Sequence, residues 1–133
     1  DYLDFDVKYE EFIKGGYVVS DGDDFTLVAS GSELEIAFKI KAALLEYSVR
    51  IISVPILNKL SNMQNEEINK LLKNKHVFPI ELGRSIGWES YLGRITKTFS
   101  IDSFGKSAPI EDLEKNFGFD VPSITKEIIK YLN

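Results

Sequence analysis

Apolar positions in the first half of the chain follow two different periods. Residues 25–30 and 49–54 are apolar almost without alternation, which is typical of strands covered on both faces of a parallel sheet. Between them apolar residues recur at helical spacing, which predicts a helix from Ser32 or Glu33 to Tyr47. A strand, a helix and a strand in this order predict a βαβ unit with a right-handed crossover. The inward stripe of the helix should contain Ile36, Ile40, Ala43, Leu44 and Tyr47, widened by Leu34, Ala37 and Phe38, with Glu35 and Lys39 on the wetter side.

Shorter signals predict further elements on both sides of this unit. Gly15-Gly16 precedes a short strand at Tyr17–Ser20, and Asp21-Gly22 after it is a strong turn signal. Pro79 cannot donate a hydrogen bond to a neighbouring strand, so the strand expected at 76–82 should lie at a sheet edge or contain a bulge. The other expected elements are helices at 64–73, at 109–117 and from Pro122 onward, and a last strand at 95–101.

The order of these elements predicts the fold class. It reads β-β-α-β-α-β-β-α-α, and the stable arrangement for such an order is a three-layer α/β/α sandwich whose mostly parallel sheet is covered by helices. A chain of 133 residues is one domain by size. We expect this domain to span 15–133, and residues 1–14 to form a linker from a preceding domain.

Composition and charge exclude several classes of function. The net charge is −5, with 16 basic residues against 21 acidic ones and no basic block, so we expect no nucleic-acid partner. The chain has no cysteine, which excludes disulfides, thiolate chemistry and Cys-based zinc sites and is consistent with a cytoplasmic protein. No apolar run approaches the roughly 20 residues of a membrane span, so we expect no membrane partner either.

Two polar loops have features that favour an anion. The first, Ser30-Gly31-Ser32-Glu33, joins a buried strand to a helix N-terminus, where free N–H groups and the helix dipole attract negative charge. The alternative is that Ser30 or Ser32 caps the helix, because every helix start has these donors.

The second polar loop is Ser103-Phe104-Gly105-Lys106-Ser107, which combines hydroxyls, a glycine and a cation. The alternative here is a turn in which Ser107 caps the helix that follows. The other reactive residue types give no pattern: the single histidine lacks a partner, and no acidic pair is marked as general acid and base. Residue chemistry alone therefore predicts a soluble α/β domain without a recognisable active site.

Six short strings occur in a fixed order along the chain. They are 15–19 (GGYVV), 29–33 (ASGSE), 49–55 (VRIISVP), 87–93 (GWESYLG), 101–109 (IDSFGKSAP) and 116–119 (NFGF). Each string alone is a weak signal, but together and in this order they resemble the third, C-terminal domain of transketolases, with Ser30 in place of the family's usual Thr and Lys106 in place of Ala.

The resemblance implies a fold and a parent enzyme. The family domain has a mostly parallel five-stranded sheet with one antiparallel strand, and Tyr17–Ser20, tied to its neighbour through Asp21-Gly22, would be that strand. The parent enzyme is expected to be a cytoplasmic homodimer that transfers a two-carbon ketol unit between sugar phosphates. Its cofactors would be thiamine diphosphate and a divalent metal, Mg or Ca.

Within such a parent, the resemblance assigns catalysis to the other domains. The diphosphate motif of the family has no counterpart here, since Asp21-Gly22-Asp23 is only a turn, so we expect neither a catalytic residue nor a cofactor in this chain. The domain would be structural, would support the dimer and would have the remaining domains of the parent chain as partners. Trp88 and Tyr91 would either anchor its core or face a neighbouring domain.

A second hypothesis belongs to a different class. The chain would be a regulatory module that binds an anion or a nucleotide through the two polar loops. Its parent would then be another thiamine-diphosphate enzyme, such as dihydroxyacetone synthase or deoxyxylulose-phosphate synthase.

Overall fold

The computed structural model describes residues 15–31, 33–82, 86–101 and 121–133. The expected linker at 1–14, the loop at 103–107 and the helix at 109–117 lie outside the described residues. The described strands are β1 (Tyr17–Ser20), β2 (Phe25–Ala29), β3 (Val49–Ser53), β4 (Val77–Leu82) and β5 (Phe99–Ile101). The described helices are α2 (Glu33–Ala43), the 3-10 helix η2 (Leu57–Asn62), α3 (Asn65–Leu72), α4 (Trp88–Leu92) and α6 (Val121–Leu132).

The strands form one mixed sheet in the order β1-β3-β2-β4-β5. β1 runs antiparallel to β3, and the other neighbouring pairs are parallel. After β2 the chain crosses through α2 to β3 on one side, and it then returns through α3 to β4 on the other side. Both crossovers are expected to be right-handed, and they move in opposite directions across the sheet, so their helices lie on opposite faces of it. The predicted α/β class, with a mostly parallel five-stranded sheet and one antiparallel strand, is confirmed.

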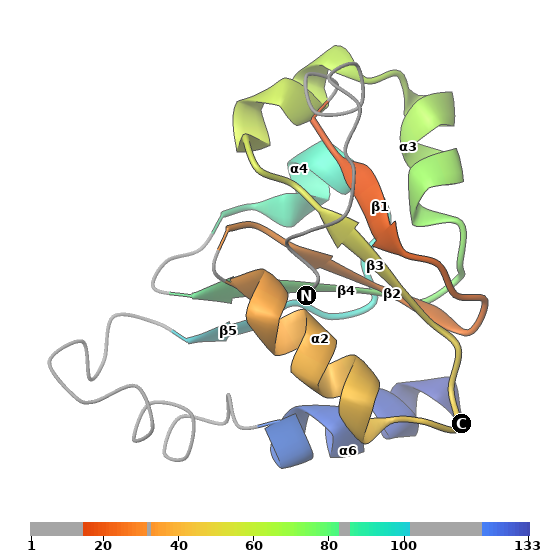
Figure 1. Cartoon of the computed structure of the whole chain (residues 1–133). Helices are drawn as coiled ribbons and strands as arrows, with labels where there is room; N and C mark the ends of the chain where they lie inside the picture. Colours follow the sequence, from red (N-terminus) through yellow and green to blue (C-terminus); the bar gives the residue numbers. More distant parts are fainter. Residues whose placement is uncertain (1–14, 32, 83–85, 102–120) are drawn as a thin grey trace, which may run out of the picture.

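Helices cover both faces of the sheet and give three layers (Figure 1). α2 and α6 lie side by side on one face, while η2, α3 and α4 cover the other. Every residue of β2 and of β3 is buried, which explains why their sequences do not alternate. The first core cluster includes Phe25, Leu27, Ile40, Phe78 and Ile124, and the second includes Val28, Ile52, Leu72, Val77 and Trp88.

The antiparallel strand pairs differently from what its turn signal predicts. β1 pairs with β3, where Val18 lies opposite Ile52, and not with β2, to which Asp21-Gly22 leads. A Cβ atom on Gly22 would lie 2.3 Å from the carbonyl carbon of Val49, so the chain passes against the start of β3 on its way to β2. The expectation of an antiparallel strand is confirmed, and that of a hairpin with the next strand is wrong.

Pro79 lies inside the sheet and not at its edge. β4 pairs with β2 on one side, where Pro79 lies opposite Val28, and with β5 on the other. The pairing with β5 begins only at Ile80, beyond Pro79, so the missing N–H interrupts no pairing there. The predicted edge position or bulge is therefore wrong, because β5 forms the edge and β4 keeps its register on both sides.

The long helix ends earlier than its periodicity predicts. α2 stops at Ala43, and Leu44 N then donates hydrogen bonds to both Ile40 O and Lys41 O at 3.1 and 3.2 Å. Ala43, expected to face inward, is exposed. The rest of the predicted inward stripe is confirmed. Leu34, Ala37, Ile40 and Leu44 are buried in the first core cluster, and Ile36, Phe38 and Tyr47 pack against it.

Most of the remaining predicted elements are confirmed, but the last strand is shorter than predicted. The helices at 64–73 and from Pro122 are confirmed as α3 and α6, and Glu35 pairs with Lys39 at 3.7 Å. The last strand covers only Phe99–Ile101, and the short helices η2 and α4 were not predicted.

Candidate functional site

Parallel α/β sheets place ligands beyond the carboxyl ends of their strands, where neighbouring crossovers diverge. In this sheet the divergence lies between β2 and β4, because the chain leaves β2 toward β3 and reaches β4 on the opposite side. Ser30 and Gly31 follow β2 at this place, while residues 83–85, which follow β4, lie outside the described residues. The first candidate site is therefore the loop from β2 to α2.

This loop forms the first turn of α2. Glu33 N donates a hydrogen bond to Ser30 O at 3.2 Å. Gly31 is exposed with φ +58, and a Cβ atom there would meet nothing within 4 Å. Glu33 and Glu35 already place negative charge in the first turn, which suits the helix dipole but opposes a bound anion. Ser32 lies outside the described residues, so helix capping and anion binding both stay predictions.

A buried carboxylate at the end of β4 was missed by sequence reasoning. The Glu81 side chain is almost fully buried, and its Oε2 accepts a hydrogen bond from Ile86 N at 2.8 Å. Alternation along β4 places Glu81 on the same face as Val77, which packs in the second core cluster. The sequence contains one signal for it, a single acidic residue near the end of an apolar strand. An acidic side chain in such a strand is rarely buried unless it has hydrogen-bonding or charged partners. Glu81 ties the end of β4 to the segment that leads into α4.

α4 is a single short helix between two glycines, and it carries Trp88 and Tyr91. Gly87 and Gly93 both have φ +77, in the left-handed region that glycine adopts without strain. Trp88 is fully buried in the second core cluster, and its indole Nε1 has no hydrogen-bond acceptor within the described residues. Tyr91 is half-buried against the same cluster. Trp88 thus anchors the core of this chain, and packing of either residue against a neighbouring domain stays a prediction.

A dense polar network lies at the amino end of the parallel strands. Arg50 Nη1 donates to Asp21 Oδ1 at 2.6 Å, and Arg50 Nε donates to Leu71 O at 2.7 Å. Lys73 pairs with Asp21 at 3.5 Å and also with Asp23. The Arg50 guanidinium therefore satisfies a carbonyl in the last turn of α3 while it holds the turn between β1 and β2.

Asn74 extends this network into the core. Its side-chain Nδ2 donates to Gly22 O at 3.0 Å and to Thr26 Oγ1 at 3.1 Å, and Thr26 Oγ1 donates to Leu72 O at 2.6 Å. Arg94 Nη2 donates to the Asn74 carbonyl at 2.7 Å. These buried polar groups satisfy one another, and they join β2, the turn before it and the end of α3.

The charges of this network favour a structural role. The hydrogen bond from Gly22 N and that from Arg50 lower the pKa of the Asp21 carboxyl. The hydrogen bond to Asp23 raises the pKa of the Lys73 ammonium. Both shifts move away from neutral pH, whereas a general acid or base works best with a pKa near the operating pH. The Asp21 carboxylate and the Lys73 ammonium therefore stay charged at neutral pH and form an ion pair there.

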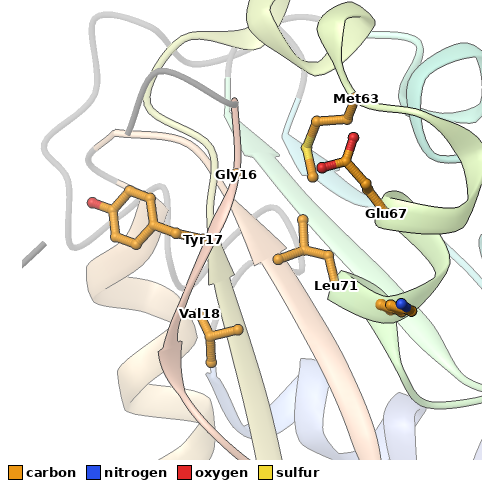
Figure 2. Close-up of a pocket in the computed structure, with 7 residues that line it drawn as sticks. Gly16, Tyr17, Val18, Met63, Glu67 and Leu71 are labelled. Carbon is orange, nitrogen blue, oxygen red and sulfur yellow. The ribbon is translucent and has the colours of Figure 1, made fainter. Parts of the chain in front are cut away.

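A groove of about 440 Å³ runs between the edge strand β1 and α3 (Figure 2). Gly16 and Val18 line it from the strand, and Met63 and Leu71 reach toward it from the helical side. A Cβ atom on Gly16 would lie 2.9 Å from Leu71 Cδ2, so glycine is what allows this close approach of strand and helix. The groove is a surface feature of the sheet edge, away from the carboxyl-end loop.

The described side chains contain no cluster of three metal ligands. In residues 15–31, 33–82, 86–101 and 121–133, no three His, Asp or Glu side chains gather in a way that could hold a metal ion. Among the described helices, none has the length and apolar character to cross a membrane.

Comparisons with known protein sequences point to one family. The model of the "Transketolase-like TK C-terminal domain" family matches residues 15–120. The transketolase of Bacillus subtilis is 34% identical over 128 residues, which cover 90% of this chain and 19% of that protein. The chain thus spans about a fifth of the length of the curated relatives it matches.

Solved structures agree with the sequence comparison. The transketolase from Leishmania mexicana superposes with a TM-score of 0.78 at 29% identity, over 95% of this chain and 19% of that chain. A split gene transketolase, described as an inactive β4 tetramer, superposes with a TM-score of 0.69 at 20% identity, over 95% of this chain and 44% of that chain. At the latter identity the likeness shows the fold alone.

Proposed function

The chain belongs to the transketolase family, as its C-terminal domain, and we propose that it has an architectural task in a parent enzyme. In this proposal the parent transfers a two-carbon ketol unit between sugar phosphates in the pentose phosphate pathway. Its other domains hold thiamine diphosphate and a divalent metal, Mg or Ca. These domains are the principal partners of this chain, and they lie either on the same polypeptide or, as the split gene relative suggests, on a second one.

One observation carries the proposal. The match to the C-terminal domain model extends over residues 15–120, and this chain covers only 19% of the Bacillus subtilis transketolase, which leaves the larger part of such an enzyme to its other domains. A structural task is also supported by the polar groups at the amino end of the strands. Asp21 pairs with Arg50 and Lys73, and Asn74 binds Gly22 O and Thr26 Oγ1, so these side chains join elements of this chain. We further propose that the parent is a cytoplasmic homodimer without nucleic-acid or membrane partners, in line with the net charge of −5.

Calorimetry tests whether thiamine diphosphate binds to the other domains of the parent and not to this chain. The 133-residue chain, titrated with thiamine diphosphate in the presence of Mg²⁺, should give no heat of binding at micromolar concentrations and should show no ketol transfer. The parent enzyme, measured in the same buffer as the control, should bind the cofactor and be active. Micromolar binding of thiamine diphosphate by the 133-residue chain alone would contradict the proposal.

A second candidate function is anion binding at the carboxyl end of the sheet. The position of Ser30 and Gly31 where the crossovers diverge favours it, with Ser32 as a further donor. Titration with inorganic phosphate, followed at the backbone amides by NMR, tests this function. Saturable shifts at Gly31 support it, and flat shifts there remove it. The same titration reports on the second loop through the amides of Ser103, Gly105, Lys106 and Ser107.

The aromatic residues of α4 give a third, smaller proposal. Tyr91 is only half-buried, and together with the buried Trp88 below it we propose that it packs against a neighbouring domain of the parent. Tyrosine fluorescence cannot isolate one of six tyrosines, so the test is Tyr91→Ala. The variant should lower the thermal midpoint of the parent clearly more than that of the 133-residue chain, in which Tyr91 loses only its contacts with the second core cluster. Equal changes in both proteins would contradict this role.

A further inference from the structure

Met63 carries the only sulfur atom of the chain. The sequence contains one methionine and no cysteine. Met63 is half-buried and lines the groove between β1 and α3, where Figure 2 shows its side chain reaching from the helical side. A peroxide converts methionine to the sulfoxide, which replaces an apolar thioether by a polar group. A reagent that oxidises sulfur therefore has a single target in this chain.

Met63 also lies at the place where α3 begins. Gln64 is the N-cap of α3, so Met63 stands one position before the cap, and Ile68 is the fourth residue of the helix. Apolar residues at these two positions often pack together and fix the angle at which the chain enters a helix. Ile68 is buried in the second core cluster, and Met63 packs against that cluster. The entry into α3 therefore depends on an apolar side chain at Met63.

The surroundings of Met63 suit a thioether better than a sulfoxide. A sulfoxide oxygen accepts hydrogen bonds, and it loses hydration if it stays against apolar side chains such as Leu71, which packs on the same cluster. The Glu67 carboxylate lines the same groove, but it is an acceptor and cannot donate to that oxygen. Water and the exposed Lys70 ammonium can donate to it, which draws the oxidised side chain from the cluster toward the surface.

We propose that Met63 is a redox-sensitive modification site, at which oxidation to the sulfoxide loosens the start of α3. In this step a lone pair of the sulfur attacks one oxygen of a peroxide, so that a sulfur–oxygen bond forms and the oxygen–oxygen bond breaks. The sulfur loses two electrons, and the displaced oxygen of hydrogen peroxide leaves as water with the proton of the transferred oxygen. Methionine sulfoxide reductases reverse this oxidation. The inference goes beyond the proposed function, since it requires only residues of this chain.

Peroxide treatment tests whether Met63 can be reached in the folded state. The 133-residue chain is incubated with hydrogen peroxide, once folded and once unfolded in urea, and the peptide that contains Met63 is followed by mass spectrometry. The half-buried thioether should oxidise in the folded chain within about tenfold of its rate in the unfolded chain, because the reaction needs no global unfolding. Stronger protection overturns the inference, because Met63 would then react only after the chain has opened.

Urea denaturation measures the consequence of the oxidation. The sulfoxide should lower the equilibrium constant for folding roughly tenfold, and treatment with methionine sulfoxide reductases should restore it. Met63→Leu is the control, because it keeps an apolar side chain of similar volume without the sulfur, and peroxide should leave its unfolding midpoint unchanged. An unchanged midpoint of the oxidised original chain, or an equal fall in Met63→Leu, overturns the inference.

A second variant tests polarity at this position without an oxidant. Met63→Gln places a polar side chain of similar length there, and it should lower the equilibrium constant for folding as oxidation does. Leu45→Gln is the matched control, because Leu45 is 87% exposed beyond the end of α2 and has little packing to lose. Equal effects of the two substitutions overturn the inference, because Met63 would then contribute no packing to the start of α3.

Discussion

The two ends of the parallel strands in this sheet are built in different ways. At the amino end, Asp21 pairs with Arg50 and Lys73. Asn74 there donates hydrogen bonds to Gly22 O and Thr26 Oγ1. At the carboxyl end, where related architectures bind ligands, the loop after β2 presents Ser30 and an exposed Gly31 with open space around its Cα. The polar side chains at the amino end thus join elements of this chain to one another, whereas the described part of the loop after β2 presents Ser30 and Gly31 at the surface.

The contacts at the amino end also differ in how far they reach along the chain. The contacts of the amino end span large sequence separations, since Arg50 and Asp21 lie 29 residues apart and Asn74 and Gly22 lie 52 apart. Such contacts stabilise the fold and do not depend on a ligand. Substitutions at the amino end should therefore destabilise the chain, and comparable substitutions at the carboxyl end should be tolerated.

The largest effect is expected for Gly22→Ala. The added Cβ atom would lie 2.3 Å from backbone atoms of Val49, which cannot move aside as a flexible side chain would. Such overpacking should cost about 3 kcal/mol in the free energy of unfolding, measured by urea denaturation. The control at the other end is Gly31→Ala, where open space leaves only the strain of φ +58 and a cost of about 1 kcal/mol. A larger loss for Gly31→Ala would reverse the comparison.

Arg50→Met comes next. The Arg50 side chain is 10% exposed and donates hydrogen bonds to Asp21, Leu71 O and Lys70 O, so its removal leaves carbonyls in the last turn of α3 without this donor. The free energy of unfolding should fall by about 2 kcal/mol. Lys39→Met, which breaks an exposed pair on α2, should cost below about 0.5 kcal/mol and serves as the control. Equal losses of unfolding free energy in the two variants would show that burial of the Arg50 guanidinium does not contribute to stability.

Asn74→Ala should have a smaller effect. The substitution removes hydrogen bonds to Gly22 O and Thr26 Oγ1 in a site that is 8% exposed, and about 1.5 kcal/mol should be lost. Asn69→Ala provides a matched control, because Asn69 is exposed and its side-chain Oδ1 accepts a hydrogen bond from Arg94 at the surface. Its effect should stay within about 0.5 kcal/mol. Thermal or urea unfolding that ranks Asn69→Ala above Asn74→Ala would contradict the structural account.

The pH dependence of the amino end is the smallest expected effect. The Asp21 pKa lies below its ordinary value of 3.8 in the folded chain, so the carboxylate stabilises the fold above that pH and loses this contribution as the pH falls through it. Lys73, whose pKa is raised, contributes below its ordinary value of 10.5 and loses that contribution as the pH rises further. Asp21→Asn should therefore reduce the acid-side slope of stability, and 1 M salt should weaken the same contribution because both groups are exposed. An unchanged slope in Asp21→Asn would rule out this linkage, and Arg50→Met should reduce the slope as well.

Sequence patterns predicted the parts of the fold that depend on local periodicity. β2 and β3 could be found because their apolar runs report burial on both faces, and α6 because Ile124 and Ile128 recur at a helical step. α4 could not be found in this way, because Gly87 and Gly93 cap a helix of one turn whose stability comes from burial of Trp88. Local signals cannot report such tertiary stabilisation.

The partner of β1 and the contacts of the buried charged residues were also harder to predict, because they depend on residues far away in the sequence or in space. The turn signal at Asp21-Gly22 is local and favoured a hairpin, whereas the observed partner of β1 is set by the close passage of Gly22 over Val49. Arg50 and Glu81 looked like ordinary charged residues within strands, because their partners lie elsewhere in space or in the following loop. The two anion-binding loops came from local signals, and they stay predictions. The family came from the order of six short strings, which no single periodicity contains.

The antiparallel pairing of β1 with β3 also has a consequence for biosynthesis. Tyr17–Ser20 leaves the ribosome before β2, α2 and β3, yet its partner residues, Ile51 to Ser53, are made only afterwards. Closing this long loop costs chain entropy, so the compact βαβ unit should assemble first and β1 should dock onto it later. During translation the uncharged strand is thus the part of the nascent domain that stays unpaired longest, and it is the segment that a chaperone would most usefully protect.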